Sequence, residues 1–326
     1  MPNKPIKQQL IAITGATATG KSTLALKLAE EMIKKDLAKH VFLLSVDSRQ
    51  VYQGLEILTA ADIPHGWQVI QEKPYRHFLH PQLNLSLHGV SIIPIWQTWS
   101  PAHFAKLYHN LKAKMTEDDV LILVGGTGFY HKQIIQPADT LGISPNPTLR
   151  QQLNKKSLGF LQEQLRQFDR EKFEAMNSSD SQNPRRLIRA IEVAQANQAG
   201  NKKTTNNDRQ ENHILNLHLS LNTQKQQEQI ERRVAERFKD AVHEVRAVLH
   251  QFKLSPELPA ASSLGFQEIL QYLNHQLDAQ QAILAWQRAE IQFSKRQTTW
   301  WKKVPGLINL EADDPQLLTK AFQLVL

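Results

Sequence analysis

The residues with the clearest chemistry lie near the start of the chain, where positions 15–22 read GATATGKS. This octet fits G-x-x-x-x-G-K-[ST], in which glycines let the backbone curl so that several N–H groups face one anion. Lys21 adds a positive charge, and the hydroxyl of Ser22 is a ligand for Mg²⁺. The octet therefore predicts a site for a diphosphate or a longer phosphate chain. The residues assigned to this site are Gly15, Ala16, Thr17, Ala18, Thr19, Gly20, Lys21 and Ser22, and Ser22 is also the predicted metal ligand.

The flanking segments must position this octet. Residues 10–14 are a short apolar run that stops at the octet, which is typical of a buried parallel strand. Apolar residues then recur every three or four positions from Leu24 to Met32, which predicts a helix. Residues 41–46 and 120–124 are two further strand-like runs. The pattern predicts an α/β fold in which a doubly wound parallel sheet is flanked by helices, as in P-loop NTPases, with ligands at the carboxyl ends of the strands. A chance match of the octet in a glycine-containing turn is the alternative.

An acidic residue, Asp47, follows the second predicted strand, whereas the third ends in Gly-Gly-Thr-Gly at 125–128. Both segments are expected at the same sheet edge as the octet. Asp47 could bind a metal, act as a general base, or simply cap the turn after the strand. The octet by itself favours ATP or GTP chemistry, so a kinase is open at this point.

The composition is that of a folded globular protein that attracts polyanions, with 326 residues and a net charge of +8. The absence of cysteine excludes disulfides, thiol catalysis and cysteine-bound zinc. No apolar run approaches the ~20 residues that span a bilayer, and the first residues do not resemble a cleaved leader, so we expect no membrane insertion and a cytoplasmic location. The histidines between 65 and 88 lack the spacing of a metal site.

The remainder is predicted to be mainly helical. Between Pro145 and Gln198 polar helical segments replace the strands, and Pro184 is well placed to start a helix. Residues 200–213 lack apolar periodicity and predict a loop, after which 214–221 alternate as one more strand.

Seven segments together resemble the tRNA dimethylallyltransferases, the IPP transferase family. SVDSRQVY (45–52) resembles the family signature S-[AV]-D-S-R-Q-[VI]-Y, and the octet and VGGTGFY (124–130) are similar to its P-loop and its V-G-G-T-G-L-Y segment. Later segments that resemble the family are NPRRLIRAIEV (183–193), ERRVAERF (231–238), SLGFQEILQYL (263–273) and FSKRQTTWWKK (293–303). The resemblance covers nearly the whole chain.

The resemblance implies that the N6 amine of an adenosine beside the anticodon of a tRNA attacks C1 of dimethylallyl diphosphate, with diphosphate leaving toward Mg²⁺. It makes Asp47 the candidate general base, Arg237 the cation that stabilises the leaving group, and Thr127 a hydroxyl near the diphosphate or the nucleotide. Residues 1–136 and 206–326 would form the catalytic core of a monomer, and 137–205 a helical insertion that binds the anticodon stem-loop. The residues implied to contact tRNA are Asp47, Ser48, Arg49, Gln50, Thr127, Arg150, Arg185, Arg186, Leu187, Ile188, Arg189, Ser262, Ser263, Leu264, Gly265, Phe266 and Gln267.

Several positions depart from the family, and other interpretations compete. Ala16 replaces a proline, and residues 53–88 diverge in the segment that leads toward the prenyl pocket, which leaves the prenyl chain length open. The alternatives are a small-molecule or nucleoside kinase, an RNA-binding protein without turnover, and a prenyltransferase that modifies free AMP. The arginines at 185–189 could follow a phosphate backbone or form an ordinary solvated face. Trp300 and Trp301, among basic residues, could stack on RNA or pack their helix into the core.

Overall fold

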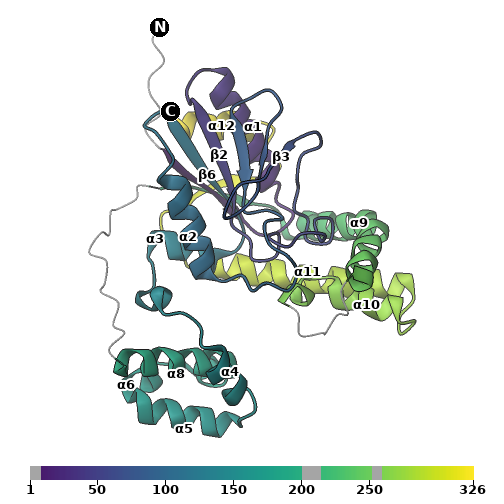
Figure 1. Ribbon diagram of the computed structural model, residues 1–326. Helices are drawn as coiled ribbons and strands as arrows, with labels where there is room; N and C mark the ends of the chain where they lie inside the picture. Colours follow the sequence, from purple (N-terminus) through teal and green to yellow (C-terminus); the bar gives the residue numbers. More distant parts are fainter. Residues whose placement is uncertain (1–8, 200–213, 252–258) are drawn as a thin grey trace. The chain divides into compact units, whose positions relative to one another are not determined.

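A computed structural model describes residues 9–199, 214–251 and 259–326 (Figure 1). The chain divides into two compact units, each treated separately below. The first unit combines Met1–Ile135 with Glu211–Leu326, and the second is Gln136–Gln210.

A sheet of eight strands is the centre of the described part of the first unit, in the order β3-β4-β5-β2-β6-β1-β7-β8. Neighbours from β5 to β8 are parallel, whereas β3, β4 and β5 pair antiparallel at one edge. The fold is therefore mixed α/β with a mostly parallel sheet. The strands are β1 (Leu10–Gly15), β2 (His40–Ser45), β3 (Gln68–Ile70), β4 (His77–Leu79), β5 (Leu85–His88), β6 (Asp119–Gly125), β7 (Leu215–Ser220) and β8 (Ile308–Glu311).

The apolar runs correctly predicted four of these strands, β1, β2, β6 and β7. The sequence analysis did not predict the other four. Each of those has only three or four residues, which is too short to show a period of two. They become strands because an edge of the sheet offers them hydrogen-bond partners, and local sequence does not record that edge.

Alternate residues of the central strands face two different layers of helices. Ile11 and Ile13 of β1 pack with α1 and α12, whereas Leu10 and Ala12 belong to the core shared with α2, α9 and α11. No helix among the described residues is both long enough and apolar enough to cross a membrane. The helices of this unit are α1 (Lys21–Lys34), α2 (Pro101–Lys112), α3 (Gly128–Ile135), α9 (Thr223–Gln251), η2 (Pro259–Ser262), α10 (Phe266–Leu273), α11 (Ala279–Trp301) and α12 (Leu317–Val325).

Helix α11 is anchored by Trp286, which is fully buried. The helix begins with a capping box, in which the Asp278 side chain accepts from the Gln281 N–H and the Gln281 side chain accepts from the Asp278 N–H. The Trp286 ring lies against Gly265, the residue that precedes α10 and has a φ of +86°. This contact ties α10 to α11, so the two helices are held as one wall of the unit.

The second unit has a helical core of its own. Leu161 and Leu165 of α5 share a buried cluster with Leu187 and Ile191 of α8. The described α-helices here each begin at a residue whose side chain accepts a backbone N–H, which is why they start where they do. The predicted helical character of this region is confirmed, and the loop predicted for 200–213 lies outside the described residues. The elements are η1 (Asp139–Gly142), α4 (Pro147–Leu153), α5 (Leu158–Phe168), α6 (Arg170–Glu174), α7 (Ser178–Ser181) and α8 (Pro184–Gln198).

We expect Gly265→Ala to destabilise the protein strongly, because a Cβ there would lie 2.4 Å from Cε2 of Trp286 on a backbone with φ of +86°. The overlap and the left-handed backbone together should cost more than ~2 kcal/mol. Gly306→Ala is the matched control, since its φ is +73° and nothing lies within 4 Å of the added Cβ. Thermal unfolding should show a clearly larger loss for Gly265→Ala, and equal midpoints for the two variants would contradict the packing argument.

Candidate active site

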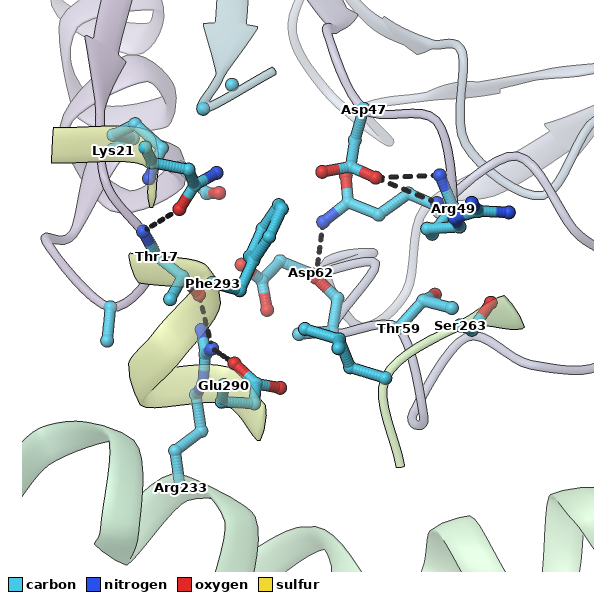
Figure 2. Close-up of a pocket in the computed structure, with 18 of the residues that line it drawn as sticks. Thr17, Lys21, Asp47, Arg49, Thr59, Asp62, Arg233, Ser263, Glu290 and Phe293 are labelled. Atoms are coloured by element: carbon cyan, nitrogen blue, oxygen red, sulfur yellow. Dashed lines mark hydrogen bonds and ion pairs between the residues drawn. The ribbon is translucent and has the colours of Figure 1, made fainter. Parts of the chain in front are cut away.

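A cavity of about 540 Å³ opens where β1, β2 and β6 end. Segments that follow these strands line one side, and α9, α11 and residues 262–264 line the other (Figure 2). The three segments predicted at one sheet edge therefore lie together. Its main lining residues are Thr17, Ala18, Gly20, Lys21, Ser22, Asp47, Ser48, Arg49, Gln50, Leu58, Thr59, Asp62, Gly126, Arg233, Ser262, Ser263, Leu264, Glu290, Phe293 and Gln297.

The P-loop, residues 15–22, connects β1 to α1. Gly15 has a φ of +145°, and a Cβ there would lie 2.5 Å from the carbonyl oxygen of Leu219, so only glycine fits. Helix α1 begins after Gly20, without a side-chain cap and without an acidic residue in its first turn. Its first N–H groups therefore lack competing side-chain acceptors and suit an anion.

Lys21 is the first residue of α1. Its Nζ donates to the carbonyl oxygen of Ala16 at 2.6 Å. Burial, followed by the charge of Arg233, lowers the pKa of Lys21 to about 8, although Asp47 and Asp62 act in the opposite direction. An anion bound beside this amine would favour its charged form.

Thr17 connects the P-loop to α9 and α11 through all three of its polar groups. Its N–H donates to Oε1 of Gln297 at 2.8 Å, and its carbonyl oxygen accepts from Nε2 of Gln226 at 2.8 Å. Its hydroxyl oxygen accepts from Nη2 of Arg233 at 2.6 Å (Figure 2). Gln226 and Arg233 belong to α9 and Gln297 to α11, so these two helices fix the position of the loop.

One of the three roles that local sequence left open for Asp47, capping the turn after β2, is visible in the structure. Oδ1 of Asp47 accepts from the N–H of Arg49 at 2.7 Å and from the N–H of Gln50 at 3.4 Å, so it does cap the turn after β2. It also lines the cavity. Burial raises its pKa, while the two N–H groups and the charges of Arg49 and Lys21 act against this rise. A carboxylate with a raised pKa beside a P-loop is suited to accept a proton.

The structure gives different environments to Arg233 and Arg237, which belong to the same motif. Arg233 lines the cavity, whereas Arg237 is not among its lining residues. Arg237 instead donates to the carbonyl oxygen of Ile57 at 3.1 Å, pairs with Glu290 at 3.4 Å, and lies 5.3 Å from the Trp286 ring. Burial, followed by the charge of Arg233, lowers its pKa to about 10.

Thr127 is also absent from the cavity lining. Its carbonyl oxygen accepts from the N–H groups of Tyr130 and His131, so Thr127 lies immediately before α3 and accepts the first hydrogen bonds of that helix. The sequence analysis missed several cavity residues, Asp62, Arg233, Glu290, Phe293 and Gln297. Glu290, Phe293 and Gln297 recur at helical spacing on α11, and Phe293 and Gln297 also belong to the segment 293–303 that resembles the family.

Residues 262–267 divide between the cavity and the core. Ser262, Ser263 and Leu264 line the cavity. Ser263 is buried, and its Oγ has no hydrogen-bond partner among the described residues. Gly265 precedes α10, Phe266 and Gln267 are its first residues, and Phe266 is buried.

In the second unit, the residues predicted to contact tRNA have different environments. Leu187 and Ile188 are buried in its core, so their side chains are not available to RNA. Arg150 and Arg189 both pair with the buried carboxylate of Glu192. Arg185 and Arg186 are exposed, and Arg186 also pairs with Asp180. The exposed arginines of α8 are therefore fewer than the motif suggested.

Comparison with known proteins assigns the chain to a family. The model of the family described as IPP transferase matches residues 50–304. The chain belongs to the IPP transferase family. It is 31% identical to a tRNA dimethylallyltransferase of Moorella thermoacetica, over 95% of this chain and 92% of that protein. It is likewise 31% identical to a tRNA dimethylallyltransferase of Picosynechococcus, over 97% of this chain and 98% of that protein.

Solved structures resemble this IPP transferase in fold. A tRNA isopentenylpyrophosphate transferase from Bacillus halodurans has a TM-score of 0.64 at 22% identity, over 97% of this chain and 95% of that one. A eukaryotic dimethylallyltransferase described as acting on tRNA has a TM-score of 0.70 at 20% identity, over 94% of this chain and 75% of that one. The likeness extends over both units of the IPP transferase.

Glu192 should stabilise the helical unit of this IPP transferase in a pH-dependent way. Burial acts to raise its pKa, but Arg150, the Asn146 N–H and Arg189 hold the pKa below its ordinary value. Because the folded pKa is depressed, this stabilisation is present at neutral pH and is lost as the pH falls below about 4.3, the usual value for glutamate. We expect Glu192→Gln to cost ~3 kcal/mol at pH 7.

Hydrogen exchange of the α5 and α8 amides measures this loss. Glu163→Gln on α5 is the control, since that carboxylate is exposed and pairs only at the surface. If both substitutions leave the exchange unchanged, Glu192 does not hold the unit together.

Proposed function

We propose that this IPP transferase transfers the dimethylallyl group of dimethylallyl diphosphate to N6 of the adenosine that follows the anticodon of a tRNA. The observation that carries the proposal is the cavity itself, which combines a P-loop, a carboxylate with a raised pKa and an arginine. The relatives with 31% identity over nearly the whole chain are tRNA dimethylallyltransferases, which supports tRNA as the acceptor.

The architecture behind this proposal is a P-loop type of core with a helical insertion. Strand β1, the loop at 15–22 and α1 follow one another as the P-loop mechanism requires. The insertion is Gln136–Gln210, which leaves the core after α3 and precedes β7. We assign the anticodon stem-loop to this insertion, with Arg185 and Arg186 as its exposed contacts.

The leaving group is the diphosphate. As the bond between C1 and the bridging oxygen breaks, negative charge grows on the diphosphate, and groups that contact it stabilise this transition state. We assign this role to the N–H groups of the P-loop, to Lys21 and to Arg233. Arg233 takes the place that motif position alone gave to Arg237, because Arg233 faces the cavity and Arg237 does not line it.

Magnesium fits this cavity through oxygen ligands. The Ser22 hydroxyl belongs to the first turn of α1 and lines the cavity, as do Asp47 and Asp62. Among the described residues, no group of three or more His, Asp or Glu side chains could hold a metal. That suits Mg²⁺, which is commonly bound through one or two protein oxygens and substrate phosphates. When bound, the ion would neutralise charge on the diphosphate.

The acceptor half of the reaction belongs to Asp47. The N6 amine forms a bond to C1 and loses a proton, and we assign the role of proton acceptor to Asp47. The target adenine must leave the base stack of the tRNA to reach the cavity, and this unstacking costs the least free energy in a single-stranded loop. Ser48, Arg49, Gln50 and residues 262–264 line the cavity around Asp47 and are the proposed contacts of the flipped nucleotide. Leu58, Leu264 and Phe293 supply apolar surface for the five-carbon chain.

Transfer of labelled prenyl from dimethylallyl diphosphate to an anticodon stem-loop with an A-A-A run tests the function. We expect wild type to label this RNA but not free AMP, and Asp47→Asn to lower kcat by about 10²- to 10⁴-fold because the proton acceptor is lost. Asp36→Asn is the matched control, since Asp36 is exposed and outside the cavity. Consumption of ATP without labelling of RNA would instead indicate a kinase.

The pH profile of kcat/KM for the donor should be bell-shaped, because this parameter reports the free enzyme. The acidic limb reflects Asp47, whose raised pKa lies above the ordinary value of 3.8 and which must be deprotonated. The alkaline limb reflects Lys21, which loses its charge as the pH rises past about 8. Lys21→Arg should move the alkaline limb to higher pH, because arginine stays protonated.

Lys27→Arg is the control for this shift, because Lys27 is exposed on α1 and does not line the cavity. An alkaline limb that stays in place in Lys21→Arg would show that another group titrates there.

A further inference from the structure

Glu290 is a buried carboxylate placed between two arginines of another helix. It lies on α11 with 6% of its surface exposed. Its Oε2 accepts from Nη2 of Arg233 at 2.9 Å, and its Oε1 pairs with Nη2 of Arg237 at 3.4 Å. A buried carboxylate is tolerated when such partners satisfy it, and it then fixes where they lie.

The two arginines are not equivalent. Arg233 has 28% of its side chain exposed and lines the cavity, and the same Nη2 that reaches Glu290 also donates to the Thr17 hydroxyl at 2.6 Å. Arg237 has 15% of its side chain exposed and is restrained by Ile57, Trp286 and the carbonyl oxygen of Arg233. Glu290 therefore connects Arg237, which does not line the cavity, to Arg233, which does. Figure 2 shows its contact with Arg233.

Charge repulsion explains why Arg233 needs such a partner. Lys21 and Arg237 both carry positive charge near it, and the charge of Arg233 lowers the pKa of each of them. In the absence of an anion, a long arginine side chain with two cationic neighbours would move toward water. The carboxylate of Glu290 opposes this movement and keeps the guanidinium beside the P-loop.

We propose that Glu290 is a positioning residue for the transfer reaction, which holds Arg233 beside Thr17 so that it is ready to bind the diphosphate. The proposal rests on the proposed function. Arg237 holds Glu290 in turn and acts on the diphosphate only through it. Gln297 lies seven residues farther along α11, and its Oε1 accepts from the N–H of Thr17. One face of this helix therefore fixes the position of both Arg233 and the P-loop.

The effect of Glu290 should pass entirely through Arg233. In Glu290→Gln the side chain keeps its size but loses its charge, and Arg233 loses a charge-assisted hydrogen bond. Affinity for the diphosphate should fall, while contacts with tRNA are untouched. In a chain that already carries Arg233→Met, the same substitution should have no further effect on affinity.

Titration calorimetry with inorganic diphosphate and Mg²⁺ tests this coupling on the full chain. We expect Arg233→Met to weaken binding by roughly 30-fold, Glu290→Gln by about tenfold, and the double variant no more than Arg233→Met alone. In steady-state transfer, Glu290→Gln should raise KM for the donor without changing KM for the stem-loop. Wild-type affinity in Glu290→Gln, or additive losses in the double variant, would overturn the proposal.

Two control substitutions lie outside the cavity. Glu228→Gln on α9 and Arg288→Met on α11 change the same residue types at exposed positions and should leave diphosphate binding unaltered. Thermal unfolding checks that each variant is folded. If Glu290→Gln does not fold, Glu290→Asp replaces it and should bind diphosphate with intermediate affinity. Wild-type affinity of Glu290→Asp for diphosphate, together with unfolding of Glu290→Gln, would reduce Glu290 to a purely structural role.

The binding assay also separates this proposal from the proposed function. If wild type binds diphosphate with the predicted coupling but transfers no prenyl group, the proposed function fails and the positioning role stands. If wild type does not bind diphosphate, both are overturned.

Discussion

The site depends on the parallel pairing of β1, β2 and β6. Thr14 pairs with Gly125 and Ser45 with Val124, so the three strands end at the same level. A Cβ at Gly125 would lie 2.4 Å from the carbonyl oxygen of Val46, and this close approach of β6 to β2 requires glycine. Because the strands end together, the P-loop, Asp47 and Gly126 line one cavity.

The strand ends make only half of the cavity, and α9 and α11 complete it. These helices come from the last third of the chain and hold the three polar groups of Thr17 through Gln226, Arg233 and Gln297. The buried ring of Trp286 fixes α11 in the core, so the polar groups on its cavity face are carried by a rigid element. These contacts hold Thr17 in place. Under the proposed function, such preorganisation would favour the charged transition state.

Each unit also contains a buried glutamate between two arginines. Glu290 pairs with Arg233 and Arg237 beside the cavity, and Glu192 pairs with Arg150 and Arg189 in the helical unit. In both places the carboxylate binds the guanidinium groups and so restricts where the arginine side chains can lie. An arginine-rich segment is therefore weak support for a nucleic-acid surface until its internal partners are known. In α8 the exposed arginines are Arg185 and Arg186, and Arg186 pairs with Asp180.

Local patterns in the sequence were sufficient for the P-loop, the four longer strands, the helices on either side and the position of Asp47. These features depend on neighbouring residues, through turn geometry and the periods of strand and helix. The motifs that resemble the family added a prediction of the reaction. The sequence could not distinguish Arg233 from Arg237, or reveal Glu290 and Gln297, because their partners lie far away along the chain; Thr17 and Gln297 are separated by 280 positions. The short edge strands and the pairing of Arg150 with Glu192 were hidden for the same reason. Only the packing of distant segments decides which side chains meet, and a hydrogen bond or an ion pair exists only where they do.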